Sequence, residues 1–281
     1  MSIKWENYSI TYREESLIMA EVLKLQNDYN YFTSANMNKL AKILKRIVPR
    51  KKWITPLHVL SMRRSYLRNL ILINHGYVFS KKTHIRELYD EGMSIVDIAK
   101  KYQYSPVMIF RILLQARGMS KVIISKITID PSCELANSYL SKRDKQELED
   151  AIKNDIINLP DQSPIIDAAD RFEVDLEKFF DKYPHQTQEH MVKEQTLLYG
   201  KAIATPDLYF PDGVMVNGKK LFWIDAKNFY GANISNIRSS LVKQAKRYTQ
   251  LYGAGAYIFK YSYSTGLTKA FGENVLLLGW Y

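Results

Sequence analysis

Residues 213–227, GVMVNGKKLFWIDAK, decide the fold of the second half of the chain. Two β-type runs of apolar residues flank Asn217-Gly218, a pair that readily adopts the positive φ angles of a tight two-residue turn. The segment therefore predicts a β-hairpin.

The segments around this hairpin predict a mixed sheet flanked by helices. An amphipathic helix is expected before it at residues 165–183, and a second helix after it at 237–253. Short apolar runs at 256–261 and 274–280 predict two more strands. The order helix, hairpin, helix, strand, strand is that of an α/β layer structure.

The first part of the chain instead predicts helices, because apolar residues recur at three and four positions. The clearest stretch is residues 84–118, where Ser94 can cap one helix and Ser105-Pro106 can start the next. This spacing is typical of a helix-turn-helix unit, with residues 106–116 as the recognition helix. The alternative is that three short helices merely pack together.

These patterns divide the chain into three parts. Residues 1–125 form the expected all-helical, helix-turn-helix nucleic-acid-binding domain, and residues 126–162 form a polar connector that holds a solvated helix. Residues 163–281 form the expected sheet domain. We therefore predict an α/β protein of two domains.

The net charge of +11 is concentrated in the helical part. Residues 1–121 carry 21 Lys and Arg against nine Asp and Glu, whereas the remaining residues carry 19 against 20. A charge excess confined to one part is typical of a module that attracts a polyanion, and nucleic acid is favoured over an anionic membrane. The side chains expected to contact it are Lys100, Lys101, Arg111, Arg117, Arg63 and Arg64.

The single cysteine, Cys133, excludes an internal disulfide and is consistent with a reducing compartment. The first 26 residues contain scattered charges and no apolar run long enough for a signal peptide or a membrane span. We therefore expect an intracellular protein that does not enter membranes, in the nucleus or cytoplasm if the source is a eukaryote.

The residues expected to carry chemistry lie at the open end of the hairpin. Asp207, in ATPDLYF, precedes the first arm, and Asp225 and Lys227 lie two apart on the second arm, so they point to one face. Pairing across the turn brings the three together. Two carboxylates supply hard oxygen ligands for Mg²⁺, and a lysine can orient a nucleophile or stabilise developing charge, as phosphodiester hydrolysis requires.

This arrangement resembles the PD-(D/E)XK nuclease superfamily, with Pro206-Asp207 followed by Asp225 and Lys227. Gln244 and Tyr248, one helical turn apart in QAKRY, match the Q-x-x-x-Y element of its RecB-like members. The alternative is that these residues have no shared function. Asp207 would then be a turn residue, Asp225 and Lys227 a surface ion pair, and Gln244 and Tyr248 part of an ordinary helix face.

One branch of that superfamily is a closer match. Thr205-Pro206-Asp207, WIDAK at 223–227, FYG at 229–231 and the helix that runs into a YGAG strand resemble the TPD-motif family, which includes the codanin-interacting nuclease. The resemblance covers roughly residues 163–262. Members of this kind have helix-turn-helix units ahead of the nuclease fold, and a codanin-like partner is implied only if that association carries over.

The resemblance also implies the metal ligands. Asp207, Asp225, the Ala226 carbonyl and a glutamate on the first helix would hold one or two Mg²⁺ or Mn²⁺ ions, with Lys227 positioning the attacking water. Glu177 is the expected helix glutamate because aromatic residues follow it, and Glu194 matches a second, upstream glutamate. Its surroundings, EQTLLYG, depart from the family pattern, and Glu189 is a rival.

We therefore expect a divalent-metal-dependent nuclease that hydrolyses DNA, including structured or branched DNA. Gln244 and Tyr248 would contact the nucleic-acid backbone or organise the outer shell of the metal. Cutting two strands would favour a homodimer. The alternatives are a non-catalytic DNA-binding regulator or scaffold that uses a nuclease fold, and a nuclease for structured RNA. A transition-metal site at His185 and His190 is disfavoured, because no H-E-x-x-H spacing is present.

Overall fold

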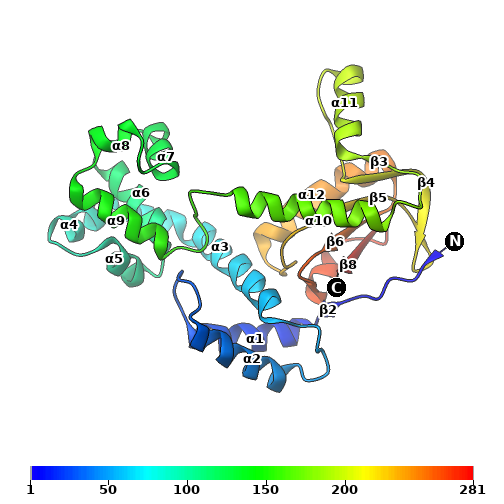
Figure 1. Ribbon diagram of the computed structural model, residues 1–281, viewed down its shortest axis with the longest axis horizontal. Coiled ribbons are helices and arrows are strands. Elements are labelled where there is room, and N and C mark those ends of the chain that lie inside the picture. The colour runs from blue at the N-terminus through cyan, green and yellow to red at the C-terminus, as the bar shows by residue number, and fades with distance from the viewer. Residues whose placement is uncertain (1, 281) are drawn as a thin grey trace. The chain divides into compact units, whose positions relative to one another are not determined.

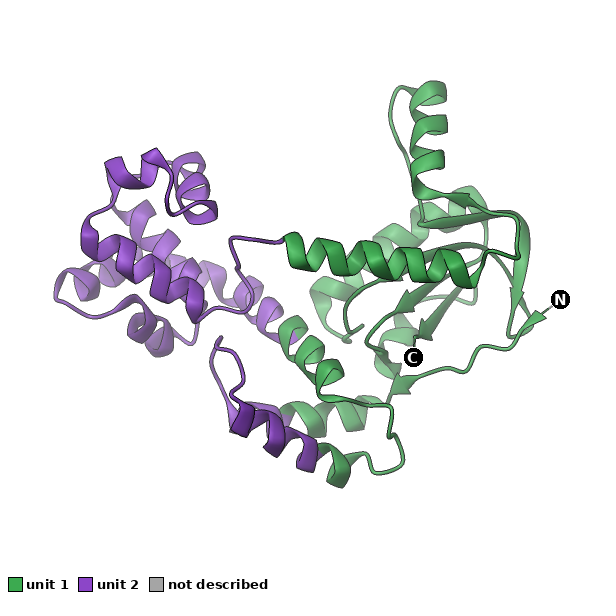
Figure 2. Cartoon of the chain, in the orientation of Figure 1, with its two compact units in different colours: residues 1–19, 44–65, 163–281 green, residues 20–43, 66–162 purple. Residues whose placement is uncertain are grey.

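The structure is a computed structural model that describes residues 2–280 (Figure 1). The chain divides into two compact units, each built from separate stretches of sequence (Figure 2). Unit 1 comprises residues 1–19, 44–65 and 163–281, and unit 2 comprises residues 20–43 and 66–162. The division differs from the expected domains, because two N-terminal stretches belong with the sheet and the expected connector belongs with the helices.

Unit 1 contains a six-stranded mixed sheet in which β1, β4, β5, β6 and β8 follow one another and β3 pairs with β4. The β4–β5 pair is antiparallel, whereas β5–β6 and β6–β8 are parallel. The strands are β1 (Ser2–Ile3), β3 (Gln186–Thr187), β4 (Leu208–Val216), β5 (Lys219–Lys227), β6 (Gly255–Phe259) and β8 (Val275–Gly279). A separate parallel pair joins β2 (Ser9–Ile10) to β7 (Tyr263–Ser264).

The hairpin forms as predicted. Asn217 has a φ of 49° and Gly218 a φ of 78°, so both turn residues occupy the left-handed region that a type I′ turn requires. The Asn217 side chain also accepts a hydrogen bond from the backbone N–H of Trp5 (2.8 Å), which ties the turn to the N-terminal segment.

Helices cover both faces of this sheet. On one face α10 (Ser163–Phe179) buries Phe172 and Leu176 against a core that includes Ile224 of β5. On the other face α12 (Ser235–Tyr252) buries Tyr248 in a second core with Trp223. Figure 1 shows α10 crossing the sheet and α11 (Gln188–Tyr199) projecting from the β3 end. A short 3₁₀ helix at Thr265–Ala270 follows β7. The mixed α/β architecture is confirmed.

Unit 2 is helical. The N-terminal helices are α1 (Tyr12–Leu25), α2 (Ser34–Ile47) and α3 (Pro56–Ser80), and a unit boundary falls inside each of them. The remaining helices are α4 (Lys82–Asp90), α5 (Ile95–Tyr102), α6 (Pro106–Ala116), α7 (Lys121–Ile129), α8 (Glu134–Tyr139) and α9 (Lys142–Lys153).

The local signals around α5 and α6 are confirmed. The Ser94 hydroxyl accepts from the backbone N–H of Asp97 and caps α5. The Ser105 hydroxyl caps α6, and Pro106 occupies its first turn. Within residues 2–280, no helix is long and apolar enough to cross a membrane.

Candidate functional site

The hairpin register places Asp207 beside Asp225. Leu208 pairs with Ile224, so the next residues outward, Asp207 and Asp225, lie opposite each other on one face of the ladder. The backbone N–H of Ala226 donates a hydrogen bond of 2.6 Å to Oδ2 of Asp207. The predicted convergence of the two carboxylates is therefore what the structure shows.

Asp225 is held by side chains of α12. Its Oδ1 accepts hydrogen bonds from the Gln244 amide (3.3 Å) and from the Tyr248 hydroxyl (3.1 Å), and the Gln244 amide also donates to that hydroxyl (2.9 Å). Asp225 is only 2% exposed and Tyr248 only 4% exposed. Tyr248 therefore cannot reach a nucleic-acid backbone. The other predicted role, organising the outer shell of a metal, is compatible with this geometry, because the pair holds the carboxylate of Asp225.

Lys227 lies on the same face of β5 as Asp225. Its ammonium forms an ion pair with Oδ2 of Asp225 and lies 5.3 Å from the centre of the Tyr257 ring. That carboxylate oxygen is buried and, within the described residues 2–280, makes no hydrogen bond besides this ion pair. The sequence patterns did not single out Tyr257, whose hydroxyl donates to the Leu241 carbonyl (2.9 Å) and thereby fixes the ring under the lysine.

The acidic groups of this site destabilise one another's charged forms. Burial, together with the negative charges of Asp225 and Glu173, raises the pKa of Asp207 to about 8, against smaller opposing effects of the Ala226 N–H and Lys227. Burial also raises the pKa of Glu173, with Asp170 and Asp225 adding to the effect. Negative charge thus exceeds positive charge in a buried setting, which is the electrostatic condition for binding a cation.

The helix glutamate at this site is Glu173 and not the expected Glu177. Glu173 is half-buried and acts electrostatically on Asp207, whereas Glu177 is exposed one turn further along α10. The two lie on the same helix face, about 6 Å apart along the axis. The sequence pattern predicted the helix and its buried face, but the turn of the helix that meets Asp207 depends on how far α10 is shifted along the sheet.

The other predicted acidic residues lie away from this centre. Glu194 is exposed on α11, where its charge acts on Tyr252. Glu189 is exposed and pairs with Lys193 (2.7 Å). His190 is exposed and His185 packs against the Phe210 ring, so the disfavoured histidine site has no geometric support.

A metal ion at this centre would need ligands from outside the protein. Among residues 2–280, no three His, Cys, Asp or Glu side chains come close enough to enclose an ion by themselves. The donor set is nevertheless suitable for Mg²⁺, which is usually held by one or two carboxylates, with water and substrate phosphate oxygens completing the octahedron. The two paired carboxylates and the buried, otherwise unbonded Oδ2 of Asp225 fit that pattern.

The expected recognition helix is the core of unit 2. Seven residues of α6 are buried, and α4, α5, α7 and α9 pack around it. Arg111, on its narrow open stripe, is half-buried and contacts the Thr128 hydroxyl at 3.4 Å. A helix covered in this way cannot enter a DNA groove, so this assignment was wrong.

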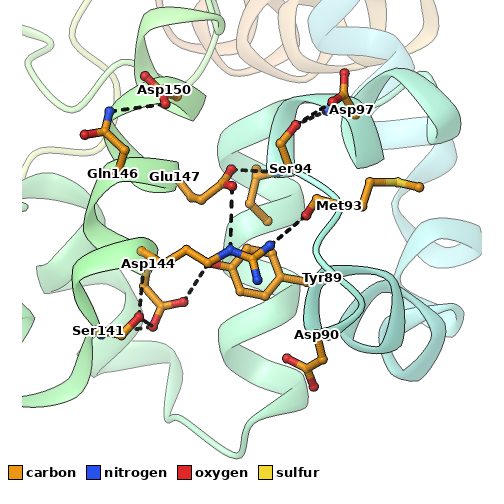
Figure 3. Close-up of polar contacts among 12 residues, drawn as sticks. Tyr89, Asp90, Met93, Ser94, Asp97, Ser141, Asp144, Gln146, Glu147 and Asp150 are labelled. Carbon is orange, nitrogen blue, oxygen red and sulfur yellow. Dashed lines mark hydrogen bonds and ion pairs between the residues drawn. The ribbon is translucent and has the colours of Figure 1, made fainter.

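Arg117 also forms its hydrogen bonds with residues inside unit 2. Its guanidinium donates to Oδ1 of Asp144 (2.9 Å), and the same oxygen accepts from the Tyr89 hydroxyl (2.9 Å). Figure 3 shows Asp144 receiving the Tyr89 and Ser141 hydroxyls. Burial alone would raise the pKa of Asp144, but hydrogen bonds from Ser141, Tyr89 and Arg117 lower it. This network stabilises the helical unit and leaves Arg117 unsuited to a phosphate contact.

The remaining predicted basic residues differ in exposure. Arg63 is only 1% exposed, so its predicted contact with nucleic acid is excluded, and Arg64 is half-buried. Lys100 is exposed but pairs with Asp97 at 3.3 Å. Lys101 is exposed on the same helix.

The basic charge also lies in a different part of the fold from the one expected. Residues 44–65 carry seven Lys and Arg and no Asp or Glu, and they belong to unit 1. The excess of positive charge is therefore larger in the unit that holds Asp207 and Asp225 than in the helical unit. The linear sequence could not reveal this, because the stretch ends 140 residues before the TPD segment begins at Thr205.

Comparison with known proteins agrees with the position of this site. Residues 140–279 match a family described as "Protein of unknown function TPD sequence-motif". The chain is also 24% identical over 282 residues to uncharacterized protein L539 of Acanthamoeba polyphaga mimivirus, an alignment that covers 98% of this chain and 93% of that protein. No solved structure matches the chain. With Thr205-Pro206-Asp207 at the acidic centre of the matched region, the chain belongs to the TPD sequence-motif family.

Proposed function

We propose that this protein is a divalent-metal-dependent nuclease that hydrolyses phosphodiester bonds in DNA. The observation that carries the proposal is the juxtaposition of Asp207 and Asp225 across the hairpin, with Lys227 in contact with Asp225. The proposal is also supported by the sequence resemblance to the PD-(D/E)XK superfamily and by the mixed sheet with helices on both faces that holds these residues.

Asp207 and Asp225 would hold the Mg²⁺ ion, with the Ala226 carbonyl as a further ligand and with Glu173, which acts electrostatically on Asp207, in the outer ligand shell. When bound, Mg²⁺ would polarise the scissile phosphate and acidify a water molecule. It would also neutralise the repulsion that raises the pKa of Asp207 and of Glu173. The raised pKa means that Asp207 must release its proton before it can act as a ligand.

Lys227 would stabilise the negative charge that develops on the phosphate. Its ion pair with Asp225 keeps the ammonium beside the acidic pair, and the Tyr257 ring limits the directions in which it can move. Gln244 and Tyr248 are positioning residues, because both fix one oxygen of Asp225 and leave the other toward Lys227. Fixed donors of this kind need no reorganisation during the reaction.

A basic segment of unit 1 supports a polyanionic substrate. The Ser61 hydroxyl accepts from the backbone N–H of Tyr230 (2.9 Å) and the Ser65 hydroxyl donates to its carbonyl (3.2 Å), so residues 44–65 dock on the loop that directly follows Lys227. Lys45, Arg50 and Lys52 of this segment are exposed. We propose that these exposed cations neutralise phosphates of the substrate on either side of the cleaved bond.

The test is a cleavage panel of labelled duplex, branched and single-stranded DNA and matched RNA, with Mg²⁺, Mn²⁺ or chelator. Asp207→Asn and Lys227→Met should each reduce cleavage by on the order of a hundredfold or more, because each removes charge stabilisation specific to the transition state. The matched controls are Asp212→Asn and Lys219→Met, which alter exposed residues of the same hairpin.

Three results would reject the proposal. Cleavage that resists chelator would exclude a metal-dependent reaction. Tight DNA binding without cleavage under either metal would favour a non-catalytic regulator. Cleavage confined to structured RNA would reassign the substrate.

A further inference from the structure

Unit 2 has an open cavity of about 560 Å³ that is lined by two tyrosines and by basic side chains. The lining residues come from the end of α3, the start of α4 and the end of α5: Tyr77, Lys81, His84, Lys101, Tyr102 and Gln103. Its volume falls within the range of small-molecule and nucleotide-sized sites.

Two lysines line this cavity, Lys81 and Lys101, and Lys82 is the neighbour of Lys81 in sequence. Among residues 2–280, no carboxylate forms an ion pair with any of these three lysines. Lys100, the neighbour of Lys101 on α5, instead pairs with Asp97, and the nearby His84 contacts Glu87 at 3.4 Å. The three unpaired ammonium groups therefore present a local cationic surface that would attract an anion.

The aromatic residues of the cavity present an exposed ring. Tyr77 is 63% exposed, so its ring is open to solvent, and the ammonium of Lys81 lies 5.7 Å from its ring centre. Burial raises the pKa of Tyr102, and the neighbouring Tyr77 phenol adds to the effect, so the two hydroxyls lie near each other. A flat ring bordered by ammonium groups is complementary to a nucleotide, because the base can stack on the ring while the ammonium groups bind the adjoining phosphates.

We propose that this cavity binds a single-stranded segment of nucleic acid, with a base stacked on Tyr77 and the flanking phosphates on Lys81 and Lys101. Proteins that bind single strands combine aromatic platforms with basic grooves in this way, whereas duplex bases are not available for stacking. As a substrate site it deepens the proposed nuclease function. The binding itself requires neither the metal nor the carboxylates of unit 1.

The test measures binding of the full chain to a fluorescein-labelled twelve-residue oligothymidylate by fluorescence anisotropy, in EDTA so that no metal-dependent cleavage occurs. Tyr77→Ala should weaken binding by roughly 5- to 100-fold, the range for loss of one stacked base. Tyr77→Trp should retain it. Tyr139→Ala, which alters another exposed tyrosine of unit 2, is the aromatic control.

The lysines provide a second, matched comparison. Lys101→Ala should reduce the slope of log affinity against log salt by about 0.7, the value for one phosphate contact on a single strand. Lys100→Ala removes the same charge one residue away, from a lysine already paired with Asp97, and should change the slope much less.

Equal effects of Lys100→Ala and Lys101→Ala would indicate diffuse attraction and overturn the proposal. Unchanged affinity in Tyr77→Ala would do the same, as would an equal loss of affinity for a matching duplex. Because no step needs catalysis, the site could be lost while the nuclease survives, or confirmed for a protein that proves not to cleave.

Discussion

Replacing Asp207 by asparagine should stabilise the metal-free protein while abolishing cleavage. Folding raises the pKa of this carboxyl from an ordinary 3.8 to about 8. The folded chain therefore retains a proton that the unfolded chain releases, and stability falls as the pH rises from about 4 towards 8. An amide of nearly the same shape removes this penalty and can still accept the hydrogen bond from Ala226.

The size of the effect follows from the same pKa. Between pH 3.8 and pH 7 the carboxyl is ionised in the unfolded chain but protonated in the folded one. This difference lowers the free energy of unfolding at pH 7 by at most ~4 kcal/mol. Because the folded Asp207 holds its proton at this pH, asparagine exchanges one neutral acceptor of the 2.6 Å bond from Ala226 for another, at little cost. The expected gain is therefore at most ~4 kcal/mol, or a rise in Tm of up to roughly 8–16 °C.

Urea and thermal unfolding followed by tryptophan fluorescence provide a suitable assay. All four tryptophans, Trp5, Trp53, Trp223 and Trp280, belong to unit 1, so the signal reports the unit that contains Asp207. The matched control is Asp212→Asn, an exposed aspartate of β4, the strand that begins directly after Asp207; it should change stability by less than about 0.5 kcal/mol.

Metal binding supplies an independent measurement. Mg²⁺ at a hundred times its dissociation constant should stabilise the native protein by about 3 kcal/mol, and this stabilisation should disappear in Asp207→Asn. If the variant were less stable than Asp212→Asn in the absence of metal, the repulsion inferred at this site would not exist. Equal stabilisation of both proteins by Mg²⁺ would show that the ion binds elsewhere.

Three further predictions concern the roles of single side chains. Glu173→Gln should lower the cleavage rate by roughly 10- to 100-fold in single-turnover assays, as loss of an outer ligand-shell partner does. Glu177→Gln, one turn away and exposed, should leave the rate nearly unchanged. The reverse order of effects would restore Glu177 as the helix glutamate. Tyr248→Phe should reduce kcat about tenfold and leave KM unchanged, because its buried hydroxyl fixes Asp225 and does not touch substrate; a change in KM alone would contradict a positioning role. Arg117→Ala should destabilise unit 2 by about 1–3 kcal/mol, because it removes a hydrogen bond from the buried carboxylate of Asp144. Hydrogen exchange of the α6 and α9 amides measures this loss. The control Arg86→Ala, which removes an exposed ion pair, should cost less than about 0.5 kcal/mol.

The parts of the fold that the sequence predicted depend on local chemistry. The Asn217-Gly218 turn, the Ser94 cap and the convergence of the two hairpin arms each follow from residues that are close in sequence or joined by one tight turn. The exact pairing of Asp207 with Asp225 does not follow from the turn, because the register shifts between Tyr209 and Val214 before Leu208 pairs with Ile224. The identity of the helix glutamate could not be predicted either, because it depends on long-range packing.

The errors in the helical part have one physical cause. Charge and periodicity show that a helix is amphipathic, but they do not show whether its polar side chains meet solvent or other side chains. Arg63 and Arg117 appear in basic or mixed segments, yet one is buried and the other is bound to Asp144. The α6 sequence is strongly apolar, with Val107, Ile109 and Phe110 in its first half, and that composition is better explained by a core helix than by a recognition helix.

The N-terminal segment explains why basic charge and acidic chemistry belong to one unit. The Trp5 indole donates to the Gly279 carbonyl (3.0 Å), and the Tyr8 carbonyl lies so close to Gly279 that a Cβ there would collide with it. Ser9 pairs with Tyr263 in the β2–β7 ladder. These contacts fix the first residues against the last strand, and the chain then returns through residues 44–65 to dock beside Lys227. A cationic segment from the start of the sequence is thereby held beside carboxylates from its end, so the attraction of a polyanion and the chemistry proposed for it depend on the same folded unit.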